Sequence, residues 1–250
     1  MEQQSGFSFS HTADYRYIDL ALQARWALFC DLEQEIQAFT PKKEADFADY
    51  RASELERLRT LNPSSGEEDL LAFIDGQIKA HTNPGLQLIL RFSDRVMAEY
   101  VTVAVLAHAL SEATINKILA VGLAAVEAAD VFALLERADI KEKWVAGPKA
   151  FHPSYDLPKG SALYQTLQHL TRQRNAFVHY KIELEVSGQK KLRGSRLDRS
   201  PLRTKIEWLR RFYSVPYDLE AHAYSQIPRH LGWGFVDSGP IERFTGHGKP

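Results

Sequence analysis

The sequence predicts an all-α fold, and three observations lead to that prediction. Apolar residues recur at helical spacing along almost every segment, for example at Leu22, Trp26, Phe29 and Leu32. Proline and glycine residues fall between these segments, where they end one helix and allow the next to begin. The chain has 250 residues, of which 44% are hydrophobic and 25% charged, so it can bury a sizeable core.

The first part of the chain, residues 1–82, is expected to form an N-terminal helical extension. Its helices are expected at residues 13–38, at residues 44–61 and from about residue 65 to residue 83. Proline follows shortly after each of them, and proline rarely continues a helix. Ser65-Gly-Glu-Glu68 is a capping-box pattern, which is typical of a helix start.

Residues 83–231 are expected to form the helical core. Helical segments are predicted from about 85 to 123 with a bend or break near Ser93, then at 126–138, at 141–144, after a capping Ser161 through 171–181, from Pro201 through Phe212, and at 217–231. Three prolines and two glycines between Gly147 and Gly160 predict a long structured loop. The last residues, 232–250, are expected to form a flexible tail.

The composition excludes several classes of protein. A formal net charge of -1 gives no global field toward nucleic acid or membrane, so a nucleic-acid surface would have to be local. The single cysteine, Cys30, excludes an internal disulfide framework and a thiolate metal cluster. No basic stretch precedes an apolar run at the N-terminus, and charged residues interrupt the most apolar segment. We therefore expect a cytoplasmic protein that does not enter a membrane.

Common nucleotide, hydrolase and metal motifs are absent from the sequence. It contains no P-loop, no Gly-x-Gly-x-x-Gly, no nucleophile elbow and no His-Glu-x-x-His. We therefore expect neither a cofactor nor a bound metal ion.

The most informative stretch is Thr171-Arg-Gln-Arg-Asn-Ala-Phe-Val-His-Tyr-Lys181. On the helix leading through it, successive intervals of four, three, four and three residues separate Leu163, Leu167, Leu170, Arg174 and Phe177. Arg174 therefore occupies a position of the apolar stripe where leucine would be expected. A guanidinium buried there needs a carboxylate, a phosphate or a water-filled cleft as its partner.

Another face of the same helix carries a polar stripe. Gln168, Arg172, Asn175 and His179 lie at i, i+4, i+7 and i+11. A guanidinium and a titratable imidazole within two turns suit phosphodiester chemistry at neutral pH. Arg174 and His179 differ by about 140° around an ideal helix, whereas Arg172 lies about 20° from His179. Either arginine can be the catalytic cation, and the helical pattern alone also allows a structural arginine and a surface histidine.

Three stretches occur in an order that is known from one superfamily. The first is Ser111-Glu112-Ala-Thr-Ile-Asn116, the second runs from Leu134 to Trp144, and the third is Arg174-Asn175-x-x-x-His179. Together they resemble the HEPN superfamily of all-helical domains, which carry an arginine and a histidine at this kind of spacing. The resemblance covers roughly residues 85–231 and implies an antiparallel, HEPN-like helical bundle.

This resemblance implies a metal-independent endoribonuclease. The site would be composite, formed where the motif helices of two chains meet in a homodimer. His179 would act as general base or acid at the ribose 2′-hydroxyl, Arg174 would stabilise charge on the phosphate, and Asn175 would position the helix and the phosphate. The expected supporting residues are Arg172, Tyr180, Glu112 and Asn116. A role as toxin or antiviral defence effector, with an antitoxin or regulatory protein as further partner, follows only by analogy.

Two groups of charged residues leave alternatives open. Glu112 and Asn116 form a stripe with His108 that is either a solvated edge or a face toward the motif helix. On that face, Glu112 or Asn116 would neutralise an arginine and orient His179, and Glu112 would raise the pKa of His179. Residues 181–211 hold ten basic and four acidic side chains, an excess of six positive charges. That excess predicts a solvated loop or an RNA contact surface. The RNA-binding candidates are Lys181, Lys190, Lys191, Arg193 and Arg196.

Two other function classes compete with the nuclease. One is a non-catalytic HEPN module that binds RNA, a nucleotide or a partner protein. The other is a plain helical scaffold. Cleavage of RNA would distinguish the nuclease from both of these. RNA binding without cleavage would favour the non-catalytic module over the plain scaffold.

Overall fold

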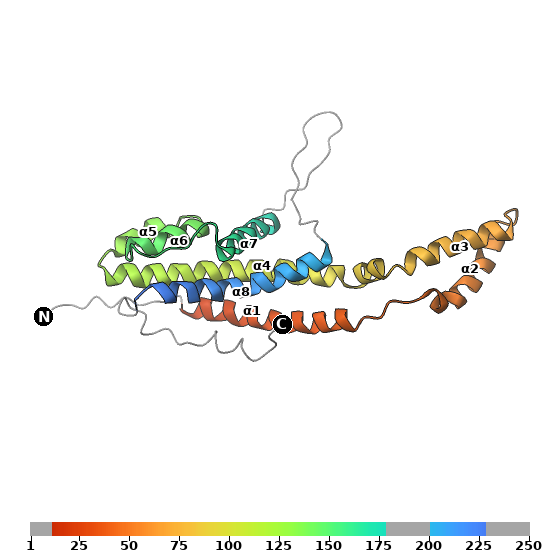
Figure 1. Cartoon of the computed structure of the whole chain (residues 1–250), viewed down its shortest axis with the longest axis horizontal. Coiled ribbons are helices and arrows are strands. Elements are labelled where there is room, and N and C mark those ends of the chain that lie inside the picture. Colours follow the sequence, from red (N-terminus) through yellow and green to blue (C-terminus); the bar gives the residue numbers. More distant parts are fainter. Residues whose placement is uncertain (1–11, 179–200, 229–250) are drawn as a thin grey trace, which may run out of the picture. The chain divides into compact units, whose positions relative to one another are not determined.

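The computed structural model describes residues 12–178 and 201–228, and the secondary structure within these ranges is entirely helical (Figure 1). The elements are α1 (Thr12–Ala38), η1 (Glu44–Phe47), α2 (Ala48–Leu61), α3 (Glu67–His81), α4 (Pro84–Ala125), η2 (Ala129–Val131), α5 (Phe132–Leu135), α6 (Ile140–Ala146), η3 (Gly147–Ala150), α7 (Ala162–Val178) and α8 (Leu202–Gln226), where η denotes a 3-10 helix. The predicted all-α fold is confirmed.

The chain divides into two compact units. Unit 1 combines Met1–Ala27 with Glu99–Pro250, and unit 2 is Leu28–Ala98. This division differs from the predicted boundary at residue 82, because the first part of α1 packs with the helices of the core. The boundaries between the units fall inside α1 and α4, which are continuous helices.

Pairs of residues between α1 and α8 show that these two helices of unit 1 are antiparallel. The ring of Trp26 stacks on that of Tyr213 with centroids 4.2 Å apart, and the Tyr217 hydroxyl donates to Asp19 Oδ1 at 2.7 Å. Residues later in α8 contact residues earlier in α1, so the two helices run in opposite directions.

One end of this α1–α8 interface carries a buried carboxylate. Glu220 is 4% exposed, and its Oε1 accepts hydrogen bonds from the hydroxyls of Tyr224 at 2.9 Å and Tyr15 at 3.3 Å. Hydroxyl donors partly replace the water that burial removes from the carboxylate.

Tyr100 of α4 contacts two other helices of unit 1. It is fully buried, and its ring contacts Phe212 of α8 with centroids 5.5 Å apart and Phe177 of α7 with centroids 5.9 Å apart. On α7, His169 stacks on Trp208 of α8 at 4.0 Å. Aromatic contacts therefore fix the positions of α7 and α8 on α4.

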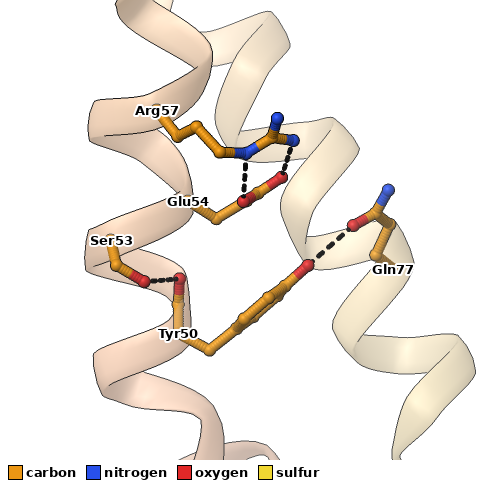
Figure 2. A network of polar contacts seen from close by, with 5 residues as sticks. All are labelled: Tyr50, Ser53, Glu54, Arg57 and Gln77. Atoms are coloured by element: carbon orange, nitrogen blue, oxygen red, sulfur yellow. Dashed lines mark hydrogen bonds and ion pairs between the residues drawn. The ribbon is translucent and has the colours of Figure 1, made fainter.

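Unit 2 contains a hairpin of α2 and α3 around a small apolar core. Its buried residues are Leu58, Leu70, Ile74 and Ile78, with Phe47 and Leu55 packed against them. At the surface of the hairpin, Tyr50 of α2 donates to Gln77 of α3 at 3.0 Å, beside the Arg57–Glu54 ion pair (Figure 2). Exposed ion pairs contribute little free energy, so the apolar core supplies most of the stability of the hairpin.

The ends of two predicted helices differ from expectation. The capping box at Ser65 is not formed, because α3 begins at Glu67 with Gly66 as an N-cap that makes no side-chain bond. The helix expected at residues 126–138 is broken into η2 and α5. Glu127 there has a φ of 58°, a left-handed conformation that an α-helix does not accommodate.

Two predicted breaks are absent from the structure. α4 continues through Ser93 over 42 residues, and α8 continues through Pro216 where two helices were predicted. Proline removes one helical hydrogen bond. The buried face of α8, which includes Val215, Pro216 and Tyr217, holds the helix together across that loss.

Among the described helices, α4 alone is long and apolar enough to cross a membrane by length and composition. The core helix of a soluble protein meets the same criteria. Buried packing around Tyr100 accounts for the apolar side chains in that part of α4.

Candidate functional site

The candidate site begins on α7, which has the two faces that its sequence predicts. Leu167 and Leu170 are fully buried, whereas Arg172 and Asn175 are exposed. The backbone N–H of Tyr164 donates to Ser161 Oγ at 3.2 Å, so the predicted N-terminal cap of this helix is confirmed.

Arg174 lies at the edge of the buried face of α7. Its side chain is half-buried, and its Nη1 donates to Asn175 Oδ1 at 3.0 Å. Within the described part of the chain, no carboxylate forms an ion pair with it. Among the described residues, no carboxylate therefore occupies its guanidinium donors, which could bind an anion.

The charge of Arg174 also acts on His108, which lies on α4. The histidine is 6% exposed, and burial is the main cause that lowers its pKa from the ordinary value. The positive charge of Arg174 lowers this pKa further, and Glu112 and Asp139 act in the opposite direction. Arg174 therefore lies within electrostatic range of α4, and His108 stays neutral at neutral pH.

Glu112 and Asn116 have a lysine as their partner. Lys143 Nζ of α6 donates to Glu112 Oε1 and to Asn116 Oδ1, both at 3.0 Å. The Lys143 side chain is 1% exposed and that of Glu112 is 41% exposed. Among the described residues, the cation that pairs with Glu112 is therefore Lys143 of α6 and not the expected arginine.

The sequence pattern was not used to predict a buried lysine at position 143. This lysine follows Ile140 by three residues and precedes Trp144, and all three side chains are buried on one face of α6. A lysine at an apolar position of a short helix is the same kind of signal that drew attention to Arg174. Reading α6 for its apolar stripe would have found it.

Close packing holds α6 in place on α4. Trp144 is fully buried, and its indole N–H donates to the Ser111 carbonyl at 3.2 Å. A Cβ on Gly147, directly after α6, would lie 2.7 Å from Leu119 Cδ2, so glycine allows this approach. α6 also contacts α7. The position of Lys143 is therefore set by a tightly packed junction of α4, α6 and η3.

Several predicted site residues lie outside the described ranges: His179, Tyr180, Lys181, Lys190, Lys191, Arg193 and Arg196. Of the nearby basic residues that are described, Arg211 places its guanidinium 5.0 Å from the centroid of the Trp208 ring and is exposed. Within residues 12–178 and 201–228, no three His, Cys, Asp or Glu side chains form a group that could hold a metal ion.

The chain was also compared with known proteins. No family model, curated protein or solved structure matches it.

Proposed function

We propose that the protein is a metal-independent endoribonuclease in which the RNA's own 2′-hydroxyl attacks the adjacent phosphate. The main support for this proposal is the burial of Arg174 and its contacts. It is a half-buried arginine with no carboxylate ion pair among the described residues, next to an exposed Asn175 and five residues before His179. An arginine placed in this way can bind a phosphate with two parallel hydrogen bonds.

The chemistry needs one base and one source of positive charge. His179 takes the proton from the 2′-hydroxyl, the 2′-oxygen bonds to phosphorus, and the bond from phosphorus to the 5′-oxygen breaks. An imidazolium returns a proton to the leaving 5′-oxygen. Arg174 stabilises the charge that builds up on the phosphate oxygens, and Asn175 orients the guanidinium through the hydrogen bond described above. Arg172 is exposed on the same helix and is the second candidate for the cation.

The site in this proposal is shared between two chains. Each chain supplies one Arg174 and one His179, and a two-fold homodimer brings two sets together. RNA is the substrate, and a defence or toxin role is an extension by analogy.

The products of RNA cleavage test this proposal. We expect fragments with a 2′,3′-cyclic phosphate and a 5′-hydroxyl, formed equally well in the presence of EDTA, and no cleavage of DNA, which lacks the 2′-hydroxyl. His179→Ala should abolish cleavage, whereas His81→Ala, at an exposed histidine of unit 2, should leave it unchanged. Loss of cleavage on chelation, or equal cleavage of DNA, would contradict this mechanism. RNA binding without cleavage by the wild-type protein would favour the non-catalytic module.

A further inference from the structure

Two half-buried aromatic rings lie against each other where α7 packs on α8. The imidazole of His169 stacks on the indole of Trp208 with ring centroids 4.0 Å apart. Both rings contact the fully buried ring of Phe212, at 5.5 Å and 5.7 Å between centroids. Phe212 therefore fixes the inner side of this aromatic pair, while solvent reaches part of both rings.

One arginine on each helix adjoins the aromatic pair. Arg211 follows Trp208 by three residues on α8, and its exposed guanidinium lies 5.0 Å from the centroid of the indole ring. Arg172 follows His169 by three residues on α7 and is also exposed. Residues three apart are neighbours on the surface of a helix. Within the described part of the chain, neither arginine forms an ion pair with a carboxylate.

The exposed face of α7 leads from this surface to the candidate site. Asn175 follows Arg172 by three residues, is exposed, and accepts the hydrogen bond from Arg174 Nη1 at 3.0 Å. A helix rises 1.5 Å per residue, so Asn175 lies only about 4.5 Å along the axis from Arg172 and about 9 Å from His169. The aromatic pair and the candidate site are therefore close enough for one strand of nucleic acid to contact both.

We propose that His169 and Trp208, with Arg172 and Arg211, form a binding surface for single-stranded RNA beside the candidate site. The guanidinium groups bind phosphate oxygens of the backbone, and an unpaired base stacks against the exposed part of the aromatic pair. The bases of a duplex already stack on one another, so the surface selects single strands. This inference rests on the proposed function and names the form of RNA that the nuclease accepts.

Trp208 has a second role at this surface. A guanidinium above an indole ring is attracted to it, so the ring limits the positions that the exposed Arg211 side chain adopts. A side chain that is already ordered loses less conformational entropy when it binds a phosphate. Trp208 is therefore both a stacking surface and a positioning residue for Arg211.

The salt dependence of binding tests the two arginines. The probe is a single-stranded oligoadenylate whose riboses all carry 2′-O-methyl groups, which blocks cleavage and isolates binding. We expect Arg211→Ala to weaken its binding about tenfold, the scale of one lost charge-assisted contact. The slope of log affinity against log salt concentration should become shallower by about 0.7, the value for one phosphate contact with a single strand. Arg172→Ala should have the same two effects.

A matched control separates these effects from a general loss of charge. Arg137 is an exposed arginine of unit 1 that follows α5. Arg137→Ala removes the same charge and should change neither the affinity nor the salt slope. An Arg211→Ala variant that behaves like Arg137→Ala would overturn the proposed surface.

The fluorescence of Trp208 tests the stacking of a base. Saturating probe should quench the emission of the wild-type protein, and Trp208→Phe should lose that quenching. Phenylalanine keeps an aromatic ring against Phe212, and circular dichroism checks that the variant folds. Trp144 is fully buried and should not respond to the probe. Equal quenching in Trp208→Phe, or equal affinity for the probe annealed to a complementary 2′-O-methyl strand, would contradict selection of single strands by this surface.

Binding and cleavage can fail separately. If the wild-type protein cleaves RNA while Arg211→Ala keeps the wild-type affinity and salt slope, the surface is refuted and the nuclease stands. If the wild-type protein binds the probe through Arg211 but cleaves no unmodified RNA, the proposed function fails and the surface stands. A wild-type protein that does not bind the probe refutes the surface, whatever its activity.

Discussion

Burial is unequal within the Lys143–Glu112 pair, and this inequality decides what each substitution costs. The lysine side chain is 1% exposed and the glutamate side chain is 41% exposed. Removing the glutamate leaves a buried ammonium group with Asn116 as its remaining acceptor. Removing the lysine leaves a carboxylate that water already reaches. Breaking a buried pair is most costly when the charge left behind is the buried one.

We therefore expect Glu112→Ala to lower the free energy of unfolding by about 2 kcal/mol or more, and Lys143→Met by less than about 1 kcal/mol. Urea denaturation of both variants measures the difference. Lys143→Met replaces the ammonium group with an apolar chain of similar length, which suits the buried position. Equal losses of unfolding free energy in the two variants would show that the burial of Lys143 does not determine the cost of breaking the pair.

Glu220 gives a prediction about pH. Burial is the main cause that raises the pKa of its carboxyl group, and the hydrogen bonds from Tyr224 and Tyr15 and the charge of Lys117 act against it. A raised pKa means that the folded protein binds this proton more tightly than the unfolded chain. Stability from this group is therefore present at low pH and is lost as the pH rises through the raised pKa.

Glu220→Gln removes this dependence while its side-chain oxygen can still accept both hydrogen bonds. We expect the stability of the variant relative to wild type to increase between about pH 4 and about pH 8. Urea midpoints at both pH values provide the measurement. Glu207→Gln, at an exposed glutamate of the same helix, should show no such change. A constant difference between Glu220→Gln and wild type would place the pKa of Glu220 at its ordinary value.

Among the elements, α4 is approached very closely by the segment that follows η3. A Cβ on Gly122 would lie 2.4 Å from the ring of Phe151, so the loop after η3 contacts the α4 backbone directly. The helix must carry glycine at this point for the loop to approach. The same junction carries Trp144 and Lys143, so its geometry bears on the candidate site.

Gly122→Ala should therefore lower the stability of unit 1 by about 1–3 kcal/mol, the range for overpacking a buried position. Gly76→Ala in α3 is the control, because a Cβ there meets nothing within 4 Å. It should stabilise α3 by up to about 1 kcal/mol, since alanine favours a helix more than glycine does. Thermal unfolding followed by circular dichroism distinguishes the two. A neutral Gly122→Ala would mean that Phe151 moves without cost.

Local sequence signals predicted the elements better than they predicted the site. Helical periodicity located α1, α4 and α7 because each buries a face of several turns. It failed at Glu127, where one left-handed backbone conformation ends the helix. It also failed at Pro216, where the packing of the buried face keeps α8 continuous. The half-buried Arg174 was anticipated from its place in the stripe. The hydrogen bond between Lys143 and Glu112 was not anticipated, because it depends on how α6 docks on α4. The predicted role of His179 stays a prediction, since this residue lies outside the described residues.

At the scale of the whole molecule, the proposed site needs a second chain. We expect a two-fold dimer in which the end of α7 is buried. Val178 at this end is 50% exposed, and Val126 near the end of α4 is 40% exposed. Val178→Asp should weaken the dimer because it places a charge in the expected interface, whereas Val126→Asp should not. Light scattering at several protein concentrations measures both. A wild-type monomer at tens of micromolar would remove the composite site.

The grouping of residues 1–27 with 99–250 has a consequence for how the gene can be altered. Unit 2 enters the chain as an insertion, and within unit 1 the two points of entry are neighbours, since Arg25 Nη1 lies 3.2 Å from Glu99 Oε1. Nature often adds a domain to an existing one at such adjacent positions. Replacing residues 28–98 by a short flexible loop should therefore leave a soluble, folded unit 1. Removing residues 1–82 should not, because it deletes the Trp26 and Asp19 partners of α8.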